Sequence, residues 1–403
     1  MAKIQRGKTV CLITTGHIAS DPRLVKEAIS LSRSGFKVHI IFTQYVSYLI
    51  NHDQHILTAH PEWTYQSLNW TGNSFQSKIN RLASKLISLF SFNKSLALNR
   101  NLLWQQKKAA DYKADLYIAH NLGALPVAVY AAKKNNVKCG FDAEDFHRYE
   151  VSDDVLDPDV KLKIAVEDKY IPQVDYITAS SPQIADKYAS LFNRRGASVL
   201  NVFPKTNSYN TIINENGPLK LFWFSQTIGP GRGIETVIES IRISELKVEL
   251  HLLGDIASGY GRHIDDLTAD MGCIVHFHQP VYADELFEIA AQFDIGLATE
   301  PYQPLNRNIC LTNKLFTYIQ CGLAVIASNT IAQTAFLSQY SEVGKLYSNV
   351  HELAHILTEY HTNRKLLYTT KQNCFNLGQA TLNWENESEK FIQNIYKVLD
   401  LTA

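Results

Sequence analysis

Residues 300–328 read EPYQPLNRNICLTNKLFTYIQCGLAVIAS, and no other stretch of the chain is as informative. A polar loop with one carboxylate, Glu300, leads into residues 311–314, which open an amphipathic helix predicted over residues 314–320. Gly322 ends this helix, and a short apolar strand is predicted over residues 324–327. A loop, a helix and a buried strand in this order are typical of a parallel sheet covered by helices.

The start of the predicted helix is suited to binding phosphate. The first N–H groups of a helix have no partner within the helix, and the helix dipole makes this end positive. Thr312, Asn313 and Lys314 stand at this point, so a hydroxyl, an amide and a cation lie within one turn. We therefore predict an anion site here, with an ordinary loop–helix–strand unit as the alternative.

Short apolar strands and helices alternate through the first half of the chain. Strands are expected at residues 9–14, 37–43, 116–119, 139–142, 176–179 and 198–202, with helices near 21–34, 123–134, 159–170 and 182–190. The alternation restarts after the polar stretch 204–218. Strands are then expected at residues 219–225, 248–253, 274–278, 295–298 and 324–327, with helices near 233–240, 260–271, 283–292, 313–320 and 351–360.

This organisation predicts an α/β protein with two Rossmann-like domains, each built on a parallel sheet. We place the first domain at residues 1–204 together with a C-terminal helical segment at residues 385–403, and the second domain at residues 205–384. Ligands of open α/β sheets bind outside the carboxyl ends of the strands, so we expect the site in a cleft between the two domains.

The composition is that of a globular protein with no electrostatic bias toward nucleic acid. The chain has 403 residues, 45% of them hydrophobic and 19% charged, with a formal net charge of zero. The six cysteines form no C-x-x-C pair, which indicates a reducing compartment. The N-terminal apolar run is too short for a signal peptide, and no stretch reaches the length of a membrane span. We therefore expect a cytoplasmic protein.

One segment, residues 75–108, is strongly basic and has no acidic residue. Apolar side chains recur in it at helical spacing, which predicts a basic amphipathic helix that could rest on an anionic membrane surface. A helix that packs its apolar face on the domain and leaves a solvated basic face is an equally good interpretation.

A glycine-rich turn follows the first strand of the second domain. Residues 223–235 read WFSQTIGPGRGIE, in which Arg232 could bind two phosphate oxygens with its guanidinium. The stretch is neither a Walker loop nor a G-x-G-x-x-G fingerprint. On its own it is a weak indication of a ligand site.

In the first domain, polar residues follow three expected strands. Gly16 comes after the first strand and permits close approach of a ligand to the backbone, and His120 ends the strand at residues 116–119. Asp142, Glu144 and Asp145 end the strand at residues 139–142, and like charges at short range raise one another's pKa, which suits acid–base work. A solvated acidic loop and a hydrogen-bonded core histidine are the competing interpretations.

Several of these segments resemble the GT-B glycosyltransferases, especially glycosyltransferase family 4. That family often reads N-K-L-F-E-Y-x-x-x-G-x-P-V-I-A-S, and the chain reads NKLFTY at residues 313–318, Gly322, and VIAS at residues 325–328. The wording DPRLVKEA at residues 21–28 and WENE at residues 384–387 is also similar to the family. The resemblance spans nearly the whole chain.

The resemblance implies a GT-B fold, with two facing Rossmann-like domains and a C-terminal helix that crosses back to the first. It implies transfer of a sugar from a nucleotide-sugar donor to a hydroxyl acceptor, such as a saccharide or a lipid-linked sugar, with retention and without a metal or other cofactor. Arg232 and Lys314 would bind the donor diphosphate, and Glu300 would contact donor sugar hydroxyls. Further donor contacts are implied for the positions of Asn313, Thr312, Thr317, Gln226 and Gly254.

Three departures from the family pattern bear on activity. Thr317 stands where the family has the glutamate that holds the ribose, and Gln226 replaces an arginine at the diphosphate. Glu144 and Asp145 replace the histidine and glutamate of the D-x-H-E wording. A noncatalytic GT-B accessory or sugar-binding protein, or a GT-B epimerase, is therefore the alternative to a glycosyltransferase.

Overall fold

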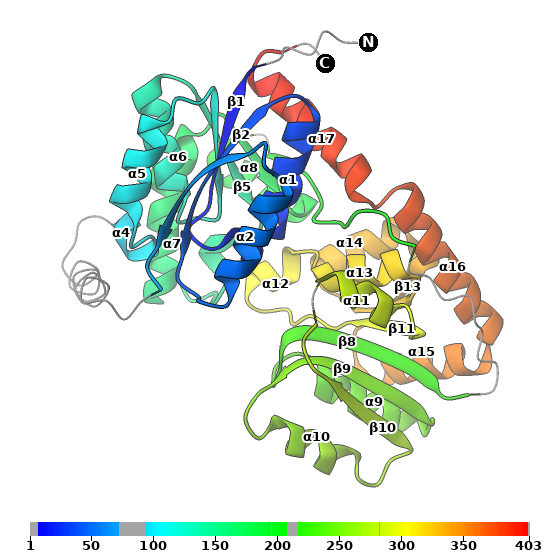
Figure 1. Ribbon diagram of the computed structural model, residues 1–403. Coiled ribbons are helices and arrows are strands. Elements are labelled where there is room, and N and C mark those ends of the chain that lie inside the picture. Colours follow the sequence, from blue (N-terminus) through cyan, green and yellow to red (C-terminus); the bar gives the residue numbers. More distant parts are fainter. Residues whose placement is uncertain (1–6, 72–93, 195, 208–216, 282, 402–403) are drawn as a thin grey trace. The chain divides into compact units, whose positions relative to one another are not determined.

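The structure is a computed structural model that describes residues 7–71, 94–194, 196–207, 217–281 and 283–401. The chain divides into two compact units (Figure 1). Unit 1 comprises residues 1–200 and 388–403, and unit 2 comprises residues 201–387. The predicted boundaries fall after residues 204 and 384.

Unit 1 is built on a parallel sheet of seven strands in the order β3-β2-β1-β4-β5-β6-β7. The strands are β1 (Thr9–Ile13), β2 (Lys37–Gln44), β3 (Thr64–Asn69), β4 (Leu116–His120), β5 (Lys138–Ala143), β6 (Tyr176–Ala179) and β7 (Gly196–Ser198). Its helices include α1 (Pro22–Arg33), α2 (Leu49–Ala59), α4 (Lys94–Leu98), α5 (Leu102–Asp111), α6 (Leu125–Asn135), α7 (Pro158–Tyr170) and α8 (Pro182–Phe192).

Unit 2 is built on a parallel sheet of six strands in the order β10-β9-β8-β11-β12-β13. The strands are β8 (Leu219–Ile228), β9 (Val248–Ile256), β10 (Cys273–His278), β11 (Ile295–Ala298), β12 (Ala324–Ser328) and β13 (Gly344–Tyr347). The helices are α9 (Ile234–Ser244), α10 (Tyr260–Thr268), α11 (Ala283–Ala290), α12 (Leu305–Ile309), α13 (Asn313–Cys321), α14 (Ile331–Gln339), α15 (Val350–Thr362) and α16 (Arg364–Ala380).

Helix α13 packs closely on β11, and this contact fixes the residues at its start. A side chain on Gly296 of β11 would lie 2.1 Å from the Tyr318 ring, so only glycine fits there. The Tyr318 hydroxyl donates to the Leu297 carbonyl at 3.2 Å. Gly322, in the left-handed conformation at φ 68°, ends the helix, as expected for a glycine just past a helix C-terminus.

Helix α17 (Trp384–Val398) begins in unit 2 and belongs to unit 1 from Ser388 onward. Its Tyr396 ring lies 5.8 Å from the Phe36 ring of unit 1. The predicted helix that crosses back to the first domain is confirmed, as is the prediction of two parallel Rossmann-like sheets.

Other predictions of local structure were wrong in detail. The sequence pattern missed β3, β13, α2, α12, α14 and α16, and it placed the strand at residues 198–202, whereas β7 covers Gly196–Ser198. Strand β9 continues to Ile256, beyond the predicted end at residue 253, so Gly254 lies within the strand. Within the predicted basic helix, α4 and α5 are two separate helices, and residues 75–93 lie outside the described residues.

Among the described residues, no helix combines the length and the apolar character that crossing a membrane requires.

Candidate active site

The candidate site of unit 2 lies where the chain order of its sheet reverses. Strands β8 and β11 are neighbours, with β9 and β10 on one side and β12 and β13 on the other. Such a switch point opens a crevice at the carboxyl ends of the two central strands. Residues 224–228 of β8 and Glu300, which follows β11, stand at this edge.

A pocket of about 450 Å³ opens here, within the size range of small-ligand sites. Its walls come from the end of β8, the loop before α9, β9, the segment after β10, α11, α12 and the start of α13. The residues are Phe224, Ser225, Gln226, Thr227, Arg232, Leu253, Pro280, Val281, Leu286, Arg307, Thr312, Asn313 and Lys314. These described lining residues include three cations and no carboxylate, so the pocket favours an anion.

Arg232 is held through its backbone by a chain of hydrogen bonds. The Thr299 hydroxyl donates to the Arg232 carbonyl at 2.7 Å and accepts from Nε1 of Trp223 at 3.0 Å. The next residue, Gly233, has φ 80°, and a Cβ there would lie 2.8 Å from Cβ of Thr299. Glycine is therefore required for this turn, which presents Arg232 to the pocket.

Lys314 and Glu300 form a buried ion pair beside the pocket. Nζ of Lys314 donates to Oε1 of Glu300 at 2.6 Å, and the two residues are 7% and 6% exposed. Nη1 of Arg307 lies 3.6 Å from the other carboxylate oxygen. The Glu300 N–H donates to Oγ of Ser328, which donates back to the Glu300 carbonyl. Glu300 is thus fixed at the backbone and lies between two pocket cations.

The start of α13 contributes backbone and polar groups to the pocket. Thr312 is the extended N-cap residue, but its side chain makes no cap hydrogen bond, and its buried Oγ1 has no hydrogen-bond partner within the part of the chain that the structure describes. Asn313 is exposed, and its Oδ1 accepts from Nδ2 of Asn201 at 3.1 Å. Thr312 and Asn313 therefore line the pocket at a helix N-terminus that is free to bind an anion.

Two residues predicted to bind the donor do not line the pocket. Thr317 is fully buried, because it lies on the packed side of α13 and has a shorter side chain than the glutamate of the family pattern. Gly254 has φ 148°, and a Cβ there would lie 2.2 Å from the carbonyl oxygen of Ser225. A register shift of β8 between Phe224 and Thr227 brings this carbonyl close to β9. The glycine thus serves the packing of two strands, whereas Gln226, in the same irregular stretch, does line the pocket.

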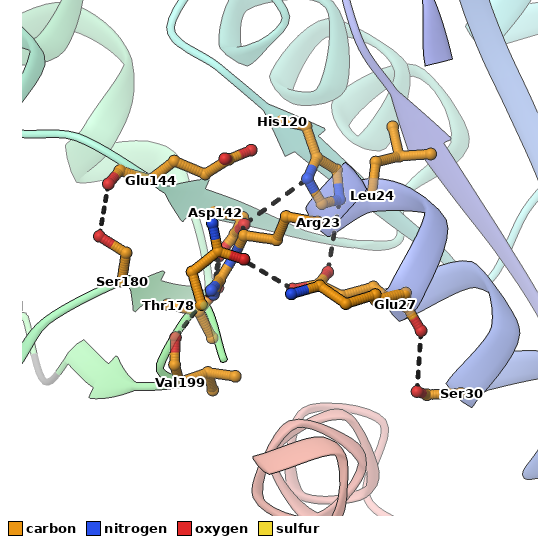
Figure 2. Close-up of polar contacts among 12 residues, drawn as sticks. Arg23, Leu24, Glu27, Ser30, His120, Asp142, Glu144, Thr178, Ser180 and Val199 are labelled. Carbon is orange, nitrogen blue, oxygen red and sulfur yellow. Dashed lines mark hydrogen bonds and ion pairs between the residues drawn. The ribbon is translucent and has the colours of Figure 1, made fainter. Parts of the chain in front are cut away.

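Unit 1 contains a buried cluster of charges at the end of β4 and β5 (Figure 2). Nε and Nη2 of Arg23 donate to the two oxygens of Asp142 at 2.5 and 2.8 Å, and Nη1 donates to the Val199 carbonyl. His120 lies between two carboxylates, with Nε2 at 3.3 Å from Glu27 and Nδ1 at 3.5 Å from Asp142. All four charged residues are 0% exposed.

The charges of this cluster set the protonation of its members. Burial alone would lower the pKa of His120, but Glu27, Asp21 and Asp142 together raise it to about 10. For Asp142, burial acts to raise the pKa, but Arg23 and His120 hold it below its ordinary value. Burial, Asp21 and Asp142 raise the pKa of Glu144 well above its ordinary value. The ionised carboxylate of Glu144 is therefore a stronger base than that of an exposed glutamate.

The structure separates the three predicted acidic residues of this strand end. Asp142 is an interior ion-pair partner of Arg23, which the sequence pattern did not indicate. Glu144 and Asp145 follow β5 and are half-buried, as is Gly16 in the loop after β1. One side-chain oxygen or nitrogen atom from each of Asp21, His120 and Glu144 lies within 4.8 Å of the other two, which is close enough for the three to hold a metal ion.

Comparison with known proteins agrees with this architecture. Residues 233–390 match a family model described as glycosyl transferase-like. The chain has a GT-B fold with a glycosyl transferase-like domain. The predicted resemblance, fold class and enzyme class, glycosyltransferase, are confirmed at this level.

Three solved structures similar to the chain illustrate the fold. HepE from Anabaena, solved with UDP and glucose, is 14% identical with a TM-score of 0.66, and the match covers 97% of this chain and 100% of that one. Sucrose-phosphate synthase from Thermosynechococcus elongatus is 14% identical with a TM-score of 0.69, covering 98% and 100%. TarM from S. aureus, solved with UDP, is 11% identical with a TM-score of 0.66, covering 98% and 100%. No curated protein matches the sequence.

Proposed function

We propose that the chain transfers a sugar from a nucleoside diphosphate sugar to a hydroxyl group of an acceptor, a saccharide or a lipid-linked sugar. The observation that carries this proposal is the pocket of unit 2, where Arg232, Arg307 and Lys314 surround the free N-terminus of α13. Because UDP is bound in the structures of HepE and TarM, a UDP-sugar is the first donor to test.

In this proposal the pocket stabilises the leaving group. The bond between the anomeric carbon and the diphosphate oxygen breaks, a bond to the acceptor oxygen forms, and the acceptor hydroxyl loses its proton. Negative charge grows on the diphosphate, and fixed cations and backbone N–H groups near it lower the barrier. The three cations and the helix start supply this charge from the protein, so we propose a reaction that needs no metal, and propose that it retains the anomeric configuration.

Glu300 has two tasks in this proposal. Its carboxylate holds Lys314 and Arg307 in the pocket, and it orients hydroxyl groups of the donor sugar. In unit 1 we assign the ionised carboxylate of Glu144, which its raised pKa makes more basic, to accepting the proton that the acceptor hydroxyl loses, and Asp145, Gly16 and His120 to positioning of the acceptor. These assignments follow from burial and charge within each unit.

Glu300→Gln distinguishes an enzyme from an accessory protein. The variant keeps the size of the side chain and removes the charge that orients Lys314 and the sugar, so we expect turnover to fall about 100-fold. The amide oxygen of the glutamine can still accept a hydrogen bond from Lys314 and keep the cations in the pocket, so UDP affinity should stay within a few-fold of the wild type. Initial rates with UDP-sugars and calorimetric titration with UDP measure the two quantities.

The donor is identified first by a thermal-shift screen of nucleoside diphosphates and their sugars, because binding to the native state raises the melting temperature. If the wild-type protein binds a nucleotide sugar but transfers nothing to any acceptor, and Glu300→Gln binds it equally well, the noncatalytic accessory protein is the better account. A new sugar isomer released from the donor would instead indicate the epimerase.

A further inference from the structure

Four polar residues share one face at the edge of the unit 2 sheet. Alternate residues of a strand point to the same face, so Glu249 and His251 lie together on β9, and His276 and His278 lie together on β10. β10 is the edge strand, and His276 pairs with His251 in the parallel register. The face thus carries three imidazoles and a carboxylate on two hydrogen-bonded strands.

The four side chains meet around His251. Its ring stacks on the His276 ring with the centroids 4.5 Å apart, and its Nδ1 lies 3.0 Å from Nε2 of His278. Its Nε2 lies 3.4 Å from Oε2 of Glu249. Ligand atoms of Glu249, His251 and His276 lie within 4.8 Å of one another.

The Nε2 atom of His251 is the unusual feature of this group. The side chain is only 10% exposed, and among the described residues this buried nitrogen has no hydrogen-bond partner. When Nδ1–H of His251 donates to Nε2 of His278, Nε2 of His251 carries a lone pair that faces the Glu249 carboxylate. In this tautomer the two electron-rich atoms repel each other, and a cation between them removes the repulsion.

We propose that Glu249, His251 and His276 bind a divalent transition-metal ion, with Zn²⁺ as the ion to test. Imidazole nitrogens with a carboxylate oxygen are an established donor set for Zn²⁺. Nε2 of His278 accepts a hydrogen bond from Nδ1–H of His251, which selects the tautomer whose Nε2 is available to the ion. The exposed His276 ring turns out of the stack to direct a nitrogen at the ion.

The surroundings leave room for this ion and for a further ligand. Glu249 also contacts Lys220, at 3.7 Å, but this half-exposed pair contributes little and gives way to a metal. Glu249 and Ile274 line a cavity of about 450 Å³, which admits a water molecule as a fourth ligand. An ion at this site joins β9 to the edge strand β10, and residues of β9 and of the segment after β10 line the donor pocket.

Titration calorimetry of the full-length, chelator-treated protein with ZnCl₂ tests the proposal. We expect one Zn²⁺ per chain, and affinity at least about tenfold lower in His276→Ala, a substitution at an exposed residue that leaves the core intact. His355→Ala removes an exposed histidine of α15 and should bind as the wild type does. His278→Ala should weaken binding about 10- to 100-fold through loss of the outer hydrogen bond.

Absorption of the Co²⁺-substituted protein identifies the ligands. We expect the bands of nitrogen and oxygen ligation without thiolate charge transfer, because the six free cysteines are buried elsewhere. Absence of binding to the wild type, equal affinity of wild type and His276→Ala, or a thiolate band would each overturn the proposal. The test does not involve nucleotide sugars, so its outcome is independent of the proposed transfer reaction.

Discussion

Lys314 is a buried ammonium group with a charged neighbour on one side and a pocket on the other. Its Nζ binds Glu300 at 2.6 Å and lies 5.5 Å from the centre of the Trp223 ring. Burial of a lysine ammonium group is unfavourable unless its charge is compensated. Here one carboxylate and the face of an aromatic ring compensate it. The remaining hydrogen-bonding capacity of the ammonium group is available to a ligand in the pocket.

Substituting this residue is the first prediction. Lys314→Ala should weaken UDP binding by about 1.5–3 kcal/mol, the size of a charge-assisted hydrogen bond. Titration calorimetry measures the loss, and Lys365→Ala, at an exposed lysine of α16, is the control that should leave affinity unchanged. If the folded Lys314→Ala variant binds UDP as tightly as the wild type does, Lys314 does not contact the donor.

His120 leads to a prediction about pH. Its pKa rises from about 6.5 in the unfolded chain to about 10 in the native protein, so the native state holds the proton more tightly. The stability that this proton contributes is fully present below pH of about 6.5 and is lost as the pH rises through about 10. The difference in free energy of unfolding between the wild type and His120→Gln should therefore shrink over this range.

Urea unfolding of both proteins at pH of about 6, 8 and 9.5 measures this difference. Cysteines and tyrosines titrate equally in both proteins, so their effects cancel. A difference that stays constant, or grows with pH, would mean that His120 is neutral between Glu27 and Asp142.

Among the single residues, those that bind the diphosphate in our proposal were predicted from the sequence better than the buried charges of unit 1. Lys314, Asn313 and Arg232 line the pocket because a helix start and a glycine turn present them there, and local sequence encodes both features. Arg307 was missed, since α12 is a single short helix without periodicity. Arg23 was missed as the partner of Asp142 because this pairing joins residues 119 apart in the chain.

Among the elements, the irregular end of β8 shapes the donor pocket. The register with β9 shifts between Phe224 and Thr227, and Ser225, Gln226 and Thr227 line the pocket there. Such a bulge redirects side chains at the end of a strand, and it often stands beside a functional site. Gly254 of β9 makes room for it.

We predict that Gly254→Ala destabilises the protein by at least about 2 kcal/mol, since its Cβ meets the Ser225 carbonyl in a conformation that only glycine adopts readily. Gly259→Ala is the matched control: φ is also positive there, at 78°, but no atom lies within 4 Å of the added Cβ. Gly259→Ala should lower the free energy of unfolding by only about 1 kcal/mol, which is the effect of the backbone conformation alone. Denaturant unfolding measures both, and equal losses would show that the bulge tolerates a side chain.

The elements that the sequence missed have weak local signals. Strand β3 is polar and mostly exposed at the sheet edge, and α16 is rich in threonine, asparagine and glutamine. Alternation of buried strands and helices predicted the central strands, because those are apolar on both faces. Edge strands and polar helices depend on tertiary contacts that a single sequence does not display.

At the scale of the whole molecule, the zero net charge conceals an uneven distribution. The basic segment 75–108 stands out in a chain that has equal numbers of acidic and basic residues. We propose that it attracts the protein to the anionic inner face of the membrane, where a lipid-linked acceptor would be found.

Substituting Lys78, Arg81 and Lys85 together by Gln should weaken binding to vesicles with anionic lipid by about 1 kcal/mol for each residue. The control replaces Lys133, Lys134 and Lys161, three exposed lysines of unit 1, and should bind as the wild type does. Vesicle sedimentation at low salt provides the measurement. If the wild-type protein does not sediment with these vesicles, peripheral membrane contact through this segment is excluded.

We propose that unit 2 binds the diphosphate of the donor at Arg232, Lys314 and the start of α13. A crystal structure of the protein with UDP tests it most directly. We expect phosphate oxygens about 2.7–2.9 Å from the Arg232 guanidinium and from Nζ of Lys314, with backbone N–H groups of α13 directed at them. UDP bound elsewhere, or a diphosphate in the pocket that neither cation contacts, would contradict it.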